Sequence, residues 1–270
     1  MVAVFTAHRP DGVTFKTKFC WLHRAFPVTW QMVFCRLHIG GVMSAVVKTT
    51  GPPKKFEFVG GDVCLDFTNT VGGKRGVSTR EYLNSYADFA CWCRQADLLD
   101  QSKADALLRV AARRPDESAA ALRRAIALRE AIYRIFAALA LGESPQAADL
   151  VYLNAELSKH HGRLRVASSK QEFNWTWADA EDALDQPLGP IARSAADLLT
   201  SPHRLEQVRR CEGGTCGWLF VDSTKNHSRR WCVMSDCGNV AKVRRFRMKN
   251  RRTRSASSAT SRKARGLKRS

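Results

Sequence analysis

The chain has 270 residues, with 44 Lys and Arg against 25 Asp and Glu, and 44% of its residues are hydrophobic. A chain of this length and composition can bury one sizeable core, which excludes wholesale disorder. No window approaches the roughly 18 to 20 uninterrupted apolar residues of a membrane span. We therefore expect a soluble, cytoplasmic protein without a membrane partner.

The positive charge is concentrated at the C-terminal end. Residues 242–270 carry 13 of the Lys and Arg residues, and no acidic residue follows Asp236. Such a run repels itself and attracts polyanions, although a solvated tail that only aids solubility is the alternative. We expect residues 251–270 to be a basic disordered tail.

The N-terminal segment has no sustained helical or strand periodicity. Residues 1–42 have mixed composition and lack the apolar region and cleavage site of a signal peptide, and a second methionine stands at position 43. We expect residues 1–50 to be an extension that is disordered or results from an over-long start assignment. The folded part then begins near Phe56.

The next segment begins with strand-like alternation. Two phenylalanines alternate with charged residues over 55–58 until a glycine pair interrupts them, which predicts a short strand or hairpin. Ser78 followed by Glu81 has the spacing of a capping box. It predicts a helix of about five turns that ends near Leu99.

Four further helices and a hairpin follow from periodicity and punctuation. Helices are predicted from Ser102 to residue 114, and over 115–139, 145–162 and 187–200, and a hairpin over 163–177. The best amphipathic stripe, interpreted as core, consists of Leu128, Ile132, Ile135 and Leu139. The fold class expected is mainly α with small β pieces (α+β).

Four of the nine cysteines form two C-x4-C pairs separated by fifteen residues. They are Cys211, Cys216, Cys232 and Cys237. Zinc takes four thiolate or imidazole ligands in a tetrahedron, and two loops that each present a pair meet this demand. Disulfides are disfavoured in a reducing compartment, and free thiols would make the paired spacing a coincidence. We predict one structural zinc ion, because four protein ligands leave no position for water.

Residues around the cysteines suit a small metal-centred module. Gly213 and Gly214 allow the first loop to fold around an ion, and Gly238 allows a tight turn beside the second pair. The aromatic residues expected to supply packing are Trp218, Phe220 and Trp231.

A basic helix is predicted directly after the fourth cysteine. A small metal-fixed fold that aims such a helix is a common means of addressing DNA. The predicted nucleic-acid contacts are Arg229, Arg230, Asn239, Lys242, Arg244, Arg245, Arg247 and Lys249.

Two segments of the chain resemble known families. CEGGTCGWLFVD at 211–222 and SRRWCVMSDCGNVAK at 228–242 resemble the CGNR zinc finger, with Val240 in place of the arginine that gives the motif its last letter. FEFVGGDVCLDFTNT at 56–70, followed by Tyr86-Ala-Asp88 and Trp92, resembles the opening of the ABATE domain of bacterial stress-associated transcription regulators. The resemblance implies an ABATE-like helix-rich domain over 55–200 and a finger over 205–250.

Asp66 and Asn69 are candidates for a ligand site, because they are polar residues among Leu65 and Phe67. The alternative is that they form turns or satisfy backbone groups. No phosphate-binding loop, dinucleotide fingerprint or hydrolase motif occurs, so we expect no catalytic residues and no enzyme.

The resemblance implies a transcription regulator whose first domain senses a small-molecule effector or mediates assembly and whose finger binds DNA. Such a protein would be nucleoid-associated, and a homodimer would strengthen weak recognition by one finger. The rivals are an RNA- or ribosome-associated protein, because phosphate attraction does not distinguish polyanions, and a small-molecule-binding protein with a purely structural finger.

Overall fold

The computed structural model describes residues 2–8, 14–20, 54–169, 172–178 and 182–250. The chain divides into two units, Met1–Ser44 and Ala45–Ser270. The predicted tail over 251–270 lies outside the described residues.

The smaller unit contains one antiparallel hairpin. Strand β1 (Val2–His8) pairs with β2 (Thr14–Cys20), so that Val2 faces Cys20 and His8 faces Thr14. The lack of periodicity in residues 1–42 predicts no regular structure here, and the hairpin shows that this prediction was wrong for these two segments. The strand propensity of its Val, Phe and Thr residues accounts for the difference. A two-stranded hairpin alone is at best marginally stable in water. That residues 1–50 are an extension outside the folded part remains a prediction.

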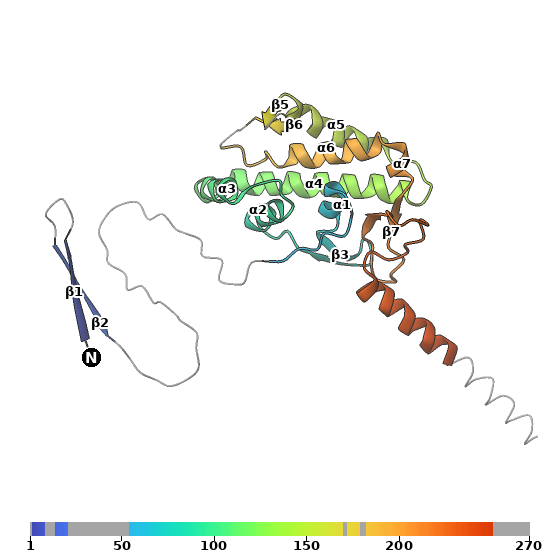
Figure 1. Ribbon diagram of the computed structural model, residues 1–270, viewed down its shortest axis with the longest axis horizontal. Helices are drawn as coiled ribbons and strands as arrows, with labels where there is room; N and C mark the ends of the chain where they lie inside the picture. Colours follow the sequence, from blue (N-terminus) through green and yellow to red (C-terminus); the bar gives the residue numbers. More distant parts are fainter. Residues whose placement is uncertain (1, 9–13, 21–53, 170–171, 179–181, 251–270) are drawn as a thin grey trace, which may run out of the picture. The chain divides into compact units, whose positions relative to one another are not determined.

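Helices dominate the larger unit, as predicted. In the described residues they are α1 (Val63–Thr68), α2 (Tyr86–Gln95), α3 (Gln101–Arg113), α4 (Pro115–Leu139), α5 (Ala147–His161), α6 (Leu188–Leu199), α7 (Pro202–Leu205) and an unlabelled helix over 239–250. The long helix α4 packs against α1, α2, α3, α5 and α6 and forms the centre of the unit (Figure 1). Its predicted stripe is core: Leu128, Ile132 and Ile135 are fully buried, and Leu139 packs against them. No described helix has the length and apolar character to cross a membrane.

The described residues of the larger unit also form three small antiparallel sheets of two strands each. They are β3 (Val71–Lys74) with β4 (Ser78–Glu81), β5 (Leu164–Ser169) with β6 (Glu172–Trp177), and β7 (Val208–Arg210) with β8 (Leu219–Val221). The pairing of β5 with β6 confirms the hairpin predicted over 163–177. The mainly α architecture with small β pieces is therefore confirmed.

Two local predictions were wrong. Residues 55–58 form no strand; instead, Phe56 is buried and Phe58 stacks on Trp92 with ring centroids 6.2 Å apart. Ser78 and Glu81 lie in β4 rather than at a helix start. The capping box belongs to Ser85, whose hydroxyl accepts from the Asp88 backbone, so α2 has 10 residues.

The hydrophobic core of the larger unit contains residues from Phe56, near its beginning, to Val221, in its last strand. Val208, Leu219 and Val221, from β7 and β8, belong to the same hydrophobic core as the buried residues of α1, α4 and α6. The last β hairpin is thus packed into the helical core.

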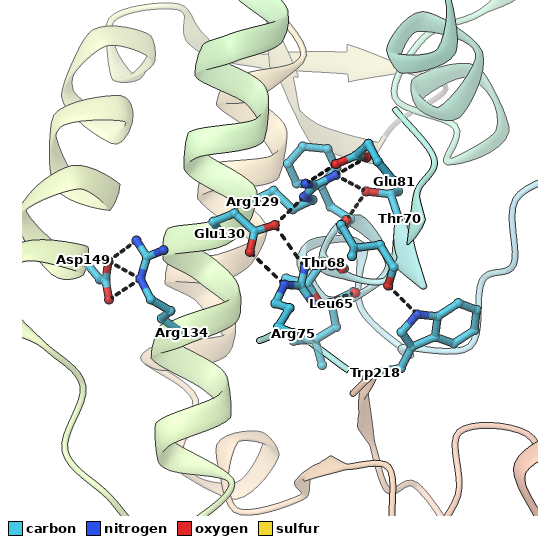
Figure 2. Close-up of polar contacts among 12 residues, drawn as sticks. Leu65, Thr68, Thr70, Arg75, Glu81, Arg129, Glu130, Arg134, Asp149 and Trp218 are labelled. Atoms are coloured by element: carbon cyan, nitrogen blue, oxygen red, sulfur yellow. Dashed lines mark hydrogen bonds and ion pairs between the residues drawn. The ribbon is translucent and has the colours of Figure 1, made fainter. Parts of the chain in front are cut away.

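A buried arginine joins α4 to β4. The Arg129 side chain is 2% exposed and donates two hydrogen bonds of 2.7 Å to the Glu81 carboxylate and one of 3.2 Å to the Thr70 hydroxyl (Figure 2). Burial by itself would raise the pKa of Glu81. The hydrogen bonds from Arg129 have the larger, opposite effect, so the pKa of Glu81 lies below its ordinary value. Removing the guanidinium would take two hydrogen bonds from this carboxylate, which would keep the one from the Leu83 backbone N–H at 2.7 Å, and one from the Thr70 hydroxyl.

We predict that Arg129→Met destabilises the fold by about 2 kcal/mol, because the partly buried Glu81 and Glu130 carboxylates lose their hydrogen bonds to the guanidinium. Arg193→Met is the matched control, since Arg193 pairs with the exposed Asp197 and exposed pairs contribute at most about 1 kcal/mol. Urea unfolding of both variants measures the difference. Equal costs for the two variants would contradict a structural role for the Arg129 network.

A second ionic cluster joins α4 to α5. Arg124 donates to Glu156 at 2.7 Å and to Asp185 at 2.6 Å, and Lys159 lies 3.0 Å from the Glu156 carboxylate. Burial raises the pKa of Glu156, but contacts with His160, Arg124 and Lys159 outweigh it and lower that pKa from 4.5 to about 2. The ionised carboxylate therefore stabilises the fold.

Because the folded-state pKa of Glu156 lies below its ordinary value, this stabilisation is present above pH 4.5 and is lost as the pH falls toward 2. We expect Glu156 to contribute about 2 kcal/mol at neutral pH. Glu156→Gln should flatten the pH dependence of the free energy of unfolding in this window. The control is Glu117→Gln, at an exposed pair with Arg114, and it should show the same pH dependence of the unfolding free energy as the wild type. Any release of zinc in acid affects the wild type and both variants alike. An unchanged pH dependence in Glu156→Gln would refute the assignment.

Candidate metal centre and nucleic-acid interface

The four predicted cysteines converge from two loops. Cys211 and Cys216 lie between β7 and β8, and Cys232 and Cys237 lie in the segment after β8. Their four sulfur atoms all lie within 4.8 Å of one another, and the Sγ of Cys232 is 3.7 Å from those of Cys216 and Cys237. A tetrahedron with zinc–sulfur bonds of about 2.3 Å has sulfur–sulfur edges of about 3.8 Å. The sulfur positions therefore fit one zinc ion with four protein ligands.

The loops are shaped to hold the sulfurs together. A Cβ atom on Gly213 would lie 3.0 Å from the Cβ of Cys216 and 3.1 Å from the Sγ of Cys237, so a side chain there would displace a ligand. The backbone N–H groups of Gly213 and Cys232 both donate to the Cys211 sulfur at 3.4 Å. Contacts with Cys216 and Cys232, together with these donors, lower the pKa of Cys211 and favour the thiolate that binds metal.

Aromatic packing around the cysteines is confirmed. Phe220 is fully buried beside Cys211 and Cys232, and Trp218 and Trp231 pack against this cluster. Only three residues of the cluster are buried, so it provides little apolar stabilisation. The metal is needed to hold the two loops together.

Arg229 faces inward rather than toward solvent. Its guanidinium lies 4.2 Å from the centre of the Phe220 ring and donates to the backbone carbonyls of Trp231, Val59 and Cys232. These contacts use the Nε and Nη2 donors of Arg229 and tie the second zinc loop to residue 59. The structure thus separates Arg229 from the other predicted nucleic-acid contacts, a distinction that its charge alone did not show.

The finger is attached to the helical part by hydrogen bonds that each involve a backbone N–H or carbonyl group. The Asn69 side chain, after α1, donates to the Leu219 carbonyl at 2.9 Å and accepts from the Leu219 N–H at 3.0 Å. The Val221 N–H donates to the Gly60 carbonyl at 2.7 Å. The Trp218 indole donates to the Val71 carbonyl at 2.8 Å (Figure 2).

Asp66 and Asn69, the candidates for a ligand site, are both buried and bonded to backbone. Asp66 accepts from the Gly60 N–H at 2.7 Å, and burial raises its pKa to about 6 against the opposing effect of that hydrogen bond. Asn69 uses both ends of its amide on Leu219. These contacts correspond to the backbone-satisfying alternative. The link between positions 69 and 219 has no signal in the local sequence.

A helix over 239–250 begins at the turn that carries the fourth ligand. The π-helical turn η1 (Met234–Gly238) contains Cys237 and runs directly into it (Figure 1). Asn239 is exposed and donates to the Ser235 carbonyl at 2.9 Å. Arg230, on the loop before Cys232, is exposed and pairs with Glu212. The exposed basic side chains of the helix are Lys242, Arg244, Arg245, Arg247 and Lys249.

A four-thiolate site that closes two short loops defines a zinc-finger protein. A family model named the CGNR zinc finger matches residues 207–250. The ABATE family model, described as "Putative stress-induced transcription regulator", matches residues 61–202, more than half of the chain. The chain belongs to the ABATE family, and both resemblances seen in the sequence are confirmed. Comparison with curated proteins gives no match.

We predict that the purified protein holds one zinc per chain and that Cys232→Ser removes it, because three thiolates hold the ion less firmly than four. The matched control is Cys91→Ser, a partly buried cysteine on α2 outside the centre. Native mass spectrometry and elemental analysis give the stoichiometry. Full zinc occupancy in Cys232→Ser, or a zinc-free wild-type chain, would contradict the site.

Proposed function

We propose that this protein is a DNA-binding transcription regulator in which the zinc finger presents the helix over 239–250 to duplex DNA. The observation that carries the proposal is the set of five exposed basic side chains on a helix that starts at the fourth zinc ligand. The family description as a regulator supports it. Neither family description names an enzyme.

Charge and shape favour a duplex as the partner. The helix contains no acidic residue, and basic side chains that neutralise phosphates supply most non-specific affinity for DNA. The major groove of B-DNA is wide enough to admit an α-helix. A metal-fixed support limits the orientations of the helix, which lowers the entropic cost of inserting it.

We further propose that the ABATE domain senses an effector or mediates assembly and acts on the finger. The support is the continuity of the two parts: β7 and β8 belong to the helical core, and Asn69, Gly60 and Val71 each bond to the finger. A change in the position of α1 would therefore move β8 directly. DNA binding of this kind places the protein at the nucleoid.

The test is fluorescence anisotropy of a 24-base-pair duplex and of a structured RNA at matched salt concentrations. Replacing Lys242 and Arg245 together with alanine should weaken DNA binding at least tenfold. It should also reduce the slope of log K against log salt by about 2, since each phosphate contact contributes about 0.9.

The charge-matched control replaces Arg109 and Arg123, exposed residues of α3 and α4, with alanine. It should leave both affinity and salt slope unchanged. Equal losses in the two double variants would show that only net charge matters. Tighter binding to the RNA at matched salt would replace DNA with RNA as the partner.

A further inference from the structure

The helix over 239–250 exposes large apolar side chains among its basic residues. Val240 is 61% exposed, Val243 48% and Phe246 65%. Steps of three residues keep side chains along one stripe of a helix, because each step turns by about 300°. These three residues, the apolar stripe, lie on the module that we propose binds DNA.

Basic side chains border the apolar stripe on both sides. By helical period, Lys242 and Lys249 lie beside Phe246, and Arg244 lies beside Val240. Arg247 lies between Val240 and Val243, and Arg245 lies farther round the helix, next to Lys249. All five are exposed. A second copy of this helix would bring ten like charges together around the stripe, which opposes pairing with itself. The charge pattern selects a polyanion as the occupant.

Duplex DNA offers an apolar group that such a stripe can contact. The 5-methyl group of thymine lies at the edge of the major groove, and apolar side chains including phenylalanine contact it there. From residue 240 to residue 246 a helix rises about 9 Å, close to three base-pair steps of about 3.4 Å. The flanking cations would meanwhile bind phosphates.

We propose that Val240, Val243 and Phe246 contact thymine methyl groups, so that the helix favours major-groove sites rich in A·T pairs. This inference rests on the proposed function and adds the chemistry of sequence preference to it. Val240 stands where the CGNR motif has its arginine, which exchanges a cation for an apolar contact at the start of the stripe. Lys242, Arg245 and Lys249 then supply affinity without sequence preference.

The test compares a thymine-containing duplex with the same duplex carrying deoxyuridine at every thymine, a change that removes only the methyl groups. We expect wild-type binding to weaken about fourfold for each contacted methyl, which is roughly sixtyfold if each of the three side chains contacts one. Replacing Val240, Val243 and Phe246 together with alanine should make binding to the two duplexes nearly equal, and Phe246→Ala alone should lower the preference about fourfold. The exposed side chains of these residues make a folding defect unexpected, and circular dichroism checks this.

Two controls separate the stripe from other effects. Val77→Ala removes an apolar side chain that is 78% exposed and lies outside the finger sequence. This variant should retain the wild-type preference for thymine. Lys242→Ala should weaken binding to both duplexes equally and leave their ratio unchanged. Retention of the full preference in Phe246→Ala would overturn the inference.

The remaining outcomes distinguish this inference from the proposed function. Equal, salt-dependent binding of wild type to both duplexes would overturn thymine contact and leave DNA binding intact. Binding to neither duplex would overturn both. Sedimentation without DNA provides a further check, because a dimer that dissociates in Phe246→Ala would show that a second copy covers the stripe.

Discussion

The zinc centre is the interaction on which the C-terminal part of this protein depends. Apart from Leu219 and Val221 of β8, which belong to the helical core, the segment from Cys211 to Cys237 has only a small cluster of its own, whose buried residues are Cys211, Phe220 and Cys232. Ordering two loops costs conformational entropy that so small a cluster cannot offset. Four thiolates around one ion provide the missing free energy. They also fix η1 and the start of the basic helix, so the metal sets the direction of the proposed DNA contact.

A continuous series of contacts connects this centre with the long helix of the core. Arg129 on α4 binds Glu81 in β4, β4 pairs with β3, and the Val71 carbonyl of β3 accepts from the Trp218 indole between the zinc ligands and β8. Figure 2 shows Arg129, Glu81 and Trp218 on the same side of α4. The finger is therefore an extension of the helical fold rather than a module on a flexible linker. A regulator built in this way can transmit a shift in its core to the helix that we propose binds DNA.

Local patterns in the sequence predicted the parts whose physics is local. The C-x4-C spacing identified all four zinc ligands, because chelation needs two donors close together in each loop. Regular apolar periods predicted α4, α6 and the β5–β6 hairpin. The capping box predicted at Ser78 was wrong, because Ser78 and Glu81 pair with the strand Val71–Lys74 and Glu81 also forms an ion pair with Arg129. The hydrogen-bond partners of Arg229 and Asn69 have no local signal for the same reason: Val59 and Leu219 lie 170 and 150 positions away.

Hydrogen–deuterium exchange of the full-length protein, with and without duplex DNA, tests the central claim most directly. The claim is that a zinc-fixed finger, packed on the helical core, presents residues 239–250 to DNA. DNA should slow exchange over 239–250 while α4 stays unchanged, and chelation of zinc should speed exchange over 208–250 and abolish the effect of DNA. Protection by DNA that falls on α2 or α3 instead, or that survives complete removal of zinc, would contradict the account.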